Sequence, residues 1–282
     1  MTDARPDAGE RTAAPIVRVG VVGAAGRMGA AVCAAVEAEA DLDLVAAVDP
    51  AAAGTSLLPP ASPGRREPLT VAADVTALAD ADVEVVVDFT VRDAARAHLP
   101  AYASAGLHAV IGTTGFGGAD LAVAAELYPP GGPLGCVVAP NFAIGAVLLM
   151  RFAELAAPWF DSAEVVELHH DGKADAPSGT AIATAERMAA ASPRWRPDPT
   201  RTETIPGARG AVGPAGIRLH ALRLQGLVAH QEVILGTVGQ TLSMRHDTTD
   251  RSSFMPGVLL AVRAVGSRPG LTVGLDSLLG IS

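Results

Sequence analysis

Cysteine and long apolar segments are scarce in this sequence of 282 residues. Its two cysteines, Cys33 and Cys136, lie in apolar surroundings and show neither metal-site spacing nor a disulfide framework, which indicates buried thiols in a reducing compartment. No apolar run is long enough to cross a membrane. Residues 1–15 mix charge, Pro and Gly without the apolar stretch of a signal peptide. We therefore expect a disordered tail at 1–15, on a cytoplasmic protein without a bound metal.

Positive charge and aromatic side chains are also in short supply. Lys and Arg total 21 against 30 Asp and Glu, for a net charge of −9, and aromatic residues make up 4%. A surface of this sign disfavours nucleic acids and anionic membranes as partners. The sequence has no HExxH zinc motif, no nucleophile elbow and no P-loop lysine. Apolar content of 49% over this length instead predicts a globular protein of two domains.

Glycine occurs in a defined pattern near the N-terminus. Residues 17–22 are an apolar run typical of a buried parallel strand, and a Gly-x-x-Gly-x-x-Gly turn follows at 23–29. A helix is expected at 30–40, and a second strand at 42–48 ends at Asp49, twenty residues past the last glycine. A strand, a glycine turn, a helix and a strand in this order, closed by an acid, indicate a dinucleotide-binding unit.

Each part of this unit has a physical role. Gly23 and Gly26 let the backbone approach a pyrophosphate, and Gly29 lets the helix pack closely on the strand. Arg27 can neutralise phosphate charge. The carboxylate of Asp49 can accept hydrogen bonds from the adenosine ribose, and it repels the 2′-phosphate of NADPH, which slightly favours NADH. Because Arg27 can partly serve a 2′-phosphate, use of both nucleotides stays open.

Three later strands also end in small or polar turns. The strands are expected at 83–87, 108–111 and 135–139, and the turns are Asp-Phe-Thr at 88–90, Gly-Thr-Thr-Gly at 112–115 and Pro-Asn-Phe at 140–142. The carboxyl ends of the strands in a doubly wound sheet meet at one edge, where ligands bind. We expect residues 112–115 to contact the ribose and nicotinamide half of the nucleotide.

The remainder of the chain predicts a second domain of another kind. An apolar helix is expected at 143–160, strand-like alternation at 217–224, 231–237 and 240–246, and a returning helix at 253–265. This pattern indicates an open mixed sheet, mostly antiparallel, with one covering helix. The predicted fold class is α/β: a Rossmann-like, doubly wound parallel sheet followed by an α+β domain. We assign residues 16–140, completed by 254–282, to dinucleotide binding, and residues 141–253 to substrate binding and oligomerisation.

Residues 169–180, here called the His-Lys loop, concentrate cationic and donor groups. His169 and His170 stand at the end of a predicted strand at 163–168, and Lys173 follows three residues later. Such a loop would repel itself unless an anion binds. Imidazole and ammonium groups also carry and exchange protons near neutral pH. The loop therefore predicts a site for an anionic molecule that must be protonated.

The end of the His-Lys loop is expected to begin a helix. Ser178 is a favoured N-cap for a helix at 179–191. The backbone N–H groups of Gly179 and Thr180 would point out of that helix end and favour a carboxylate. Histidines elsewhere in the chain have no ligands at metal spacing and are expected to be structural: His98, His220, His230 and His246.

These motifs, in this order, resemble the 4-hydroxy-tetrahydrodipicolinate reductase family, also called dihydrodipicolinate reductases, in their actinobacterial form. The most specific piece is His-His-x-x-Lys-x-Asp-Ala-Pro-Ser-Gly-Thr at 169–180. Supporting pieces lie at 23–29, 88–90, 112–116 and 139–142. The resemblance covers the chain from residue 17 to the C-terminus.

The resemblance implies a two-domain NADH- or NADPH-dependent oxidoreductase, usually a homotetramer, of diaminopimelate and lysine biosynthesis. Its substrate is a small dicarboxylate that loses a hydroxyl to give a conjugated imine, gains a hydride on the ring, and is protonated to tetrahydrodipicolinate. His169 matches the position of the proton donor or acceptor and Lys173 that of the second proton donor. His170, Gly179 and Thr180 match the substrate-carboxylate positions. The cofactor positions are matched by Gly23, Ala24, Ala25, Gly26, Arg27, Met28, Asp49, Gly112, Thr113, Thr114, Ala139, Pro140, Asn141 and Phe142.

Some alternatives remain open at this stage. Ala24, Ala25 and Pro50 stand where some members of the family carry Arg or Lys, so the nucleotide preference is undecided. A paralogue that reduces a related cyclic imine would share the same carboxylate-binding groups. A different two-domain NAD-dependent dehydrogenase should lack the His-His-x-x-Lys pattern, and a nucleotide-sensing regulator should have lost Lys173 and gained a basic segment.

Overall fold

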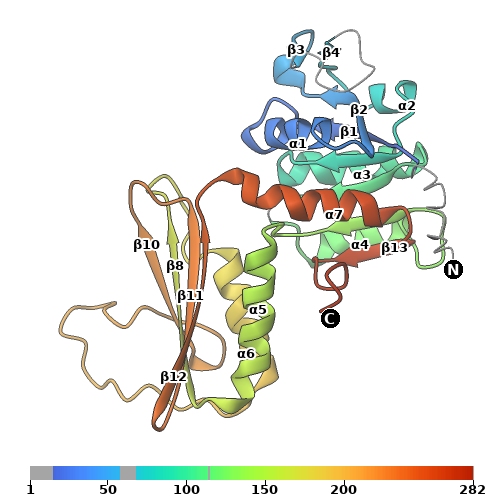
Figure 1. The fold of residues 1–282 in the computed structure, drawn as a ribbon. Helices are drawn as coiled ribbons and strands as arrows, with labels where there is room; N and C mark the ends of the chain where they lie inside the picture. The colour runs from blue at the N-terminus through green and yellow to red at the C-terminus, as the bar shows by residue number, and fades with distance from the viewer. Residues whose placement is uncertain (1–14, 58–67, 114, 282) are drawn as a thin grey trace, which may run out of the picture.

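Two sheets organise the protein. A computed structural model describes residues 15–57, 68–113 and 115–281; the expected tail at 1–15, apart from Pro15, and Thr114 lie outside them. A six-stranded sheet has the order β13-β7-β6-β5-β1-β2, and a five-stranded sheet has the order β12-β11-β8-β10-β9 (Figure 1). A short β3-β4 pair, Ser56–Leu57 with Leu69–Thr70, lies apart from both. The predicted fold class is confirmed.

The first sheet is parallel throughout and covered on both faces. Its strands are β1 (Val17–Val22), β2 (Leu42–Val48), β5 (Val85–Asp88), β6 (His108–Ile111), β7 (Gly135–Val138) and β13 (Gly270–Val273). Helices α1 (Arg27–Glu37) and α7 (Met255–Val265) pack on one face, and α3 (Arg92–Ser104) and α4 (Gly118–Leu127) on the other. Burial on both faces explains why the strands read as continuous apolar runs.

The second sheet is mixed. Its strands are β8 (Ser162–His169), β9 (Ala211–Val212), β10 (Arg218–Arg223), β11 (Ala229–Thr237) and β12 (Gln240–Thr248). The central strand β8 is parallel to β10 and antiparallel to β11. Two helices cover one face, α5 (Ile144–Ala156) and α6 (Gly179–Ala191), so the expectation of one covering helix was wrong. The apolar face of α5 places Leu149 and Ala153 in the same core as Ala185 and Met188 of α6.

Short elements complete the chain. They are α2 (Ala77–Asp80) and the 3₁₀ turns η1 (Pro50–Ala52), η2 (Ala157–Trp159), η3 (Pro214–Gly216) and η4 (Arg251–Phe254). Both cysteines are buried, and burial raises the pKa of each thiol to about 12, as expected for inert core residues. No helix among the described residues is long and apolar enough to span a membrane.

Candidate active site

The glycine turn lies where β1 ends and α1 begins. Gly23 has φ +78°, a conformation that favours glycine. A Cβ on Gly29 would lie 2.0 Å from the carbonyl oxygen of Gly23, so a side chain there would push the turn off the helix. Gly26 is the N-cap of α1 and has no side chain to occupy the first-turn N–H groups. The turn thus offers a close backbone approach and free donors, which fit a pyrophosphate.

Asp49, at the end of β2, holds this turn in place. One of its carboxylate oxygens accepts a hydrogen bond from the backbone N–H of Ala25 at 3.0 Å, and the other accepts one from Ala51 at 3.0 Å. Each carboxylate oxygen keeps further acceptor capacity for a ribose hydroxyl. Arg27 is exposed, whereas Ala24 is buried and Met28 packs against the core.

The turns after β5, β6 and β7 meet beside the glycine turn. Buried Asp88 accepts hydrogen bonds from the backbone N–H and the hydroxyl of Thr90, at 2.8 and 2.6 Å. The Thr113 hydroxyl donates to the Thr90 carbonyl at 3.0 Å. The rings of Phe89 and Phe142 lie 5.6 Å apart, centre to centre. A side chain on Gly112 would collide with Phe89, at 2.2 Å.

The predicted nucleotide residues are therefore brought to one edge of the first sheet. They are residues 23–28, Asp49, Gly112, Thr113 and residues 139–142, with Thr114 outside the described residues. Residues at this edge also meet the second sheet. A cavity of about 680 Å³ is lined by Gly115, Pro140 and Asn141 from the first lobe, the part of the protein built on the six-stranded sheet; the second lobe is built on the five-stranded sheet. Its other wall includes His169, Lys173 and Thr180 from the His-Lys loop.

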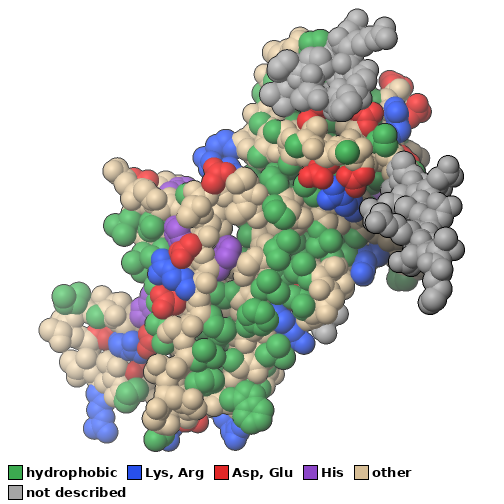
Figure 2. Space-filling model, viewed as in Figure 1, with side chains coloured by type: hydrophobic (Ala, Val, Ile, Leu, Met, Phe, Trp, Pro, Cys, Tyr) green, Lys and Arg blue, Asp and Glu red, His purple; other side chains and the backbone are tan. Residues whose placement is uncertain are grey.

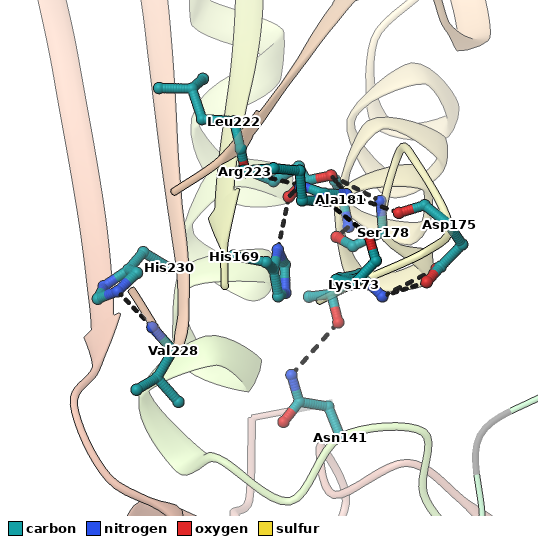
Figure 3. Close-up of polar contacts among 12 residues, drawn as sticks. Asn141, His169, Lys173, Asp175, Ser178, Ala181, Leu222, Arg223, Val228 and His230 are labelled. Atoms are coloured by element: carbon teal, nitrogen blue, oxygen red, sulfur yellow. Dashed lines mark hydrogen bonds and ion pairs between the residues drawn. The ribbon is translucent and has the colours of Figure 1, made fainter. Parts of the chain in front are cut away.

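A direct contact joins the two walls. The side-chain amide of Asn141 donates to the hydroxyl of Thr180 at 3.4 Å (Figure 3). The N-cap prediction is confirmed, because the Ser178 hydroxyl accepts from the Ala181 N–H at 3.2 Å and α6 begins at Gly179. The space at the Gly179 Cα is open. The N-terminus of α6 thus faces a cavity shared by both lobes.

His169 is held by a carboxylate that the sequence analysis passed over. Its Nδ1 lies 2.5 Å from Oε2 of Glu167, which is buried on the same strand. Burial lowers the pKa of His169 below its ordinary value, and the Glu167 charge, which acts to raise that pKa, does not fully compensate. This shift favours the neutral form of the imidazole. With Nδ1–H donated to Glu167, its Nε2 carries a lone pair.

The His-Lys loop does not repel itself, contrary to expectation. The Lys173 ammonium lies 2.7 and 2.8 Å from the two carboxylate oxygens of Asp175. That hydrogen bond, together with the Lys173 charge, lowers the pKa of Asp175. Glu167 also binds Arg223, whose Nη1 and Nη2 each donate at 2.8 Å. Figure 2 shows the same pairing outside the site, where Lys or Arg and Asp or Glu side chains lie next to each other over the second lobe.

Other residues differ from their expected places. His170 is not among the described residues that line the cavity. His230 and His246, expected to be structural, do line it, together with Gln231. Nδ1 of His230 lies 2.6 Å from a carboxylate oxygen of Asp247. The sequence signal for Gln231 and His246 was the alternation of inward and outward residues along β11 and β12. Each of the two residues places a polar side chain at an inward position.

The amino-acid composition also singles out Lys173. Lys173 is the only lysine in the chain, and all the other basic residues counted with it are arginines. Arginine remains protonated in proteins, whereas a lysine ammonium can give up a proton. The single lysine of the chain thus lies where the cavity, His169 and the α6 N-terminus meet.

Comparisons with known proteins agree with this arrangement. Residues 17–142 match the family model "Dihydrodipicolinate reductase, N-terminus", and residues 145–279 match "Dihydrodipicolinate reductase, C-terminus". The chain is 51% identical over 269 residues to the 4-hydroxy-tetrahydrodipicolinate reductase of Nocardia farcinica (strain IFM 10152), covering 94% of this chain and 99% of that protein. It is 49% identical over 266 residues to that of Mycobacterium marinum (strain ATCC BAA-535 / M), covering 94% and 100%.

A solved structure is similar over nearly the whole chain. It is the dipicolinate-bound dihydrodipicolinate reductase from Paenisporosarcina sp. TG-14, with 38% sequence identity and a TM-score of 0.79. The similarity covers 93% of this chain and 99% of that one.

Proposed function

The chain belongs to the dihydrodipicolinate reductase family, and we propose that its reaction takes place in the cavity between the two sheets. The protein is an oxidoreductase that reduces 4-hydroxy-tetrahydrodipicolinate to tetrahydrodipicolinate in diaminopimelate and lysine biosynthesis. One observation supports this location above the others. His169, Lys173 and the N-terminus of α6 share a cavity with Pro140 and Asn141 of the nucleotide-binding edge.

The family depends on a pyridine nucleotide, and the glycine turn, Asp49, Gly112, Thr113, Thr114 and residues 139–142 would hold it. When bound, the nicotinamide supplies a hydride to the substrate ring. We infer that NADH is slightly favoured over NADPH. The support is the Asp49 carboxylate, which is anchored to the glycine turn where a 2′-phosphate would meet like charge.

This preference is testable with freshly made substrate and both nucleotides. We expect kcat/KM to be higher with NADH than with NADPH, and Asp49→Ser to shift the ratio toward NADPH by about tenfold. A like-charge contact near the surface costs on the order of 1 kcal/mol, and 1.4 kcal/mol corresponds to a factor of ten. The matched control is Asp43→Ser, on the same strand and away from the glycine turn. Absence of substrate-dependent oxidation with either nucleotide would contradict the proposed function itself.

The substrate's carboxylates are assigned to the second wall. The N–H groups of Gly179 and Thr180 at the start of α6, with the Lys173 ammonium, provide converging donors for an anion. His170 is assigned by resemblance and would have to turn toward the cavity. Dipicolinate, the ligand of the Paenisporosarcina protein, is a planar dicarboxylate of this kind.

We assign the proton steps to His169 and Lys173. Lys173 carries an ammonium proton at the cavity wall and can donate it. His169 in its neutral form presents Nε2, which can accept a proton from the substrate ring and return it. The Glu167 carboxylate would stabilise the imidazolium formed in between. Solvent restores the proton that Lys173 loses.

We also propose the domain division given by the sequence, 16–140 with 254–282 and 141–253. Membership of β13 in the first sheet supports it. We infer a cytoplasmic homotetramer, assembled through the outer face of the second sheet. That face carries an open hollow of about 1130 Å³, and Leu222 in its lining is exposed. A molar mass in solution other than four times 28.5 kDa would contradict this assembly.

A further inference from the structure

The carboxylate of Glu167 lies behind the proposed substrate wall and contacts His169, Ser178 and Arg223. We propose that Glu167, together with Arg223, is a positioning residue that fixes which atom of His169 meets the substrate and ties down the loop that carries Lys173. This inference rests on the proposed function and adds to it two residues that do not touch the substrate. Four donors converge on Glu167, from His169, Ser178 and both terminal nitrogens of Arg223.

Glu167 occupies a position that would ordinarily hold an apolar side chain. On β8 it follows Val165 on the inner face, where Val165 packs with Val233 and Met188 in the second core. Its side chain is 1% exposed. Burying a carboxylate costs several kcal/mol unless partners compensate. Burial acts to raise the pKa of Glu167, but the hydrogen bonds from Arg223 and His169 outweigh it and hold the pKa below its ordinary value. Glu167 is therefore a buried anion. Its burial costs free energy, and a role in core packing alone does not explain why a carboxylate stands here.

The first consequence concerns the imidazole of His169. Oε2 of Glu167, as an ionised acceptor, requires a proton on Nδ1 of the ring. The other nitrogen, Nε2, then carries no proton in the neutral form and is the one available to the cavity that His169 lines. A ring bonded in this way cannot rotate freely, so the direction of the lone pair is fixed as well.

The second consequence concerns the His-Lys loop. Arg223 Nη2 donates to the Asp175 carbonyl at 2.6 Å, and Arg223 Nε donates to the Lys173 carbonyl at 3.3 Å (Figure 3). The backbone N–H of Ser178 donates to Oε1 of Glu167 at 3.0 Å. The middle and the end of the loop are thus bound to one carboxylate, directly or through one guanidinium. Lys173, the α6 N-terminus and His169 keep a common geometry because they share this anchor.

The chain contains a matched control on the opposite face of the same strand. Glu164 lies three residues before Glu167 and also binds one histidine and one arginine. His220 Nε2 lies 2.6 Å from its Oε2, and Arg209 Nη2 donates to its Oε1 at 2.6 Å. Glu164 lines the outer hollow and not the cavity with Lys173. The same substitution at both positions therefore distinguishes a positioning role of Glu167 from the general effect of losing a carboxylate that binds a histidine and an arginine.

The test compares Glu167→Gln with Glu164→Gln in the full chain. In Glu167→Gln the new NH₂ group faces His169 Nδ1, which favours the Nε2–H tautomer and removes the acceptor from the cavity. We expect kcat to fall about 10- to 100-fold, by analogy with the loss of the carboxylate partner of a metal-binding histidine, with nucleotide affinity unchanged. The acid limb of the kcat/KM profile should move to lower pH, because the charge that raises the pKa of His169 is gone. Glu164→Gln should retain kcat and the pH profile of kcat/KM. Its molar mass in solution should equal that of the wild type.

The tautomer itself is measured by ¹⁵N NMR of histidine-labelled protein, with His169→Gln used to assign the signal. Wild-type protein should show His169 protonated on Nδ1, and this result does not depend on whether any variant folds. An Nε2–H tautomer in the wild type would overturn the proposal. So would a Glu167→Gln enzyme that loses activity with the tautomer and the acid limb unmoved, since that pattern indicates a merely structural role. If the wild type does not oxidise NADH or NADPH with substrate, the proposed function fails instead.

Discussion

Lys173→Met is expected to lower kcat by about 10³-fold, within the range for removal of a general acid. Methionine keeps the length of the side chain and removes both the charge and the proton. Lys173→Arg should lower kcat to a similar extent while KM for the substrate changes little, because arginine keeps the charge but does not release a proton. The measurement is steady-state nucleotide oxidation, with nucleotide affinity from fluorescence titration as the control. Wild-type turnover in Lys173→Arg would show that Lys173 supplies only charge.

His169→Gln has the second largest expected effect, a loss of about 10²-fold in kcat/KM. The wild-type profile should fall as the pH drops below the pKa of His169, because protonation of Nε2 removes the acceptor. Burial places that pKa below its ordinary value of 6.5, so the limb lies on the acid side of neutrality. Glutamine does not titrate, and the limb should disappear from the variant. A variant that keeps the wild-type limb would assign the titration to another group.

The first sheet was predictable because its strands are buried on both faces. A strand such as β5, with Val85, Val86 and Val87 in a row, leaves a continuous apolar run that no other element explains. The helix α4 left no such signal, since residues 118–127 are Ala-rich and have no clear apolar stripe. The strand β13, at 270–273, is four residues long and begins at a glycine. Its place in the sheet comes from tertiary pairing with β7.

In the proposed site, the sequence pointed to groups that line the cavity but not to the groups that hold them. His169, Lys173 and Ser178 lie within ten residues, so local order was enough to bring them together. The partner of Glu167 is Arg223, 56 residues away on β10, and only the sheet makes them neighbours. The Lys173–Asp175 ion pair, by contrast, is local, and the prediction of a self-repelling loop overlooked it. The contact between Asn141 and Thr180, which joins the two lobes, also lies beyond any local pattern.

The most direct test of the account uses the fact that Lys173 is the only lysine. An amine-acylating reagent can modify this side chain and the α-amino group, and peptide mass spectrometry follows each one separately. With saturating pyridine-2,6-dicarboxylate and oxidised nucleotide, acylation of Lys173 should slow by at least about tenfold, because the bound ligand protects this side chain in most of the molecules. The α-amino group should react as before. Equal rates of Lys173 acylation with and without the dicarboxylate, at concentrations that inhibit nucleotide oxidation, would contradict binding of the substrate in this cavity.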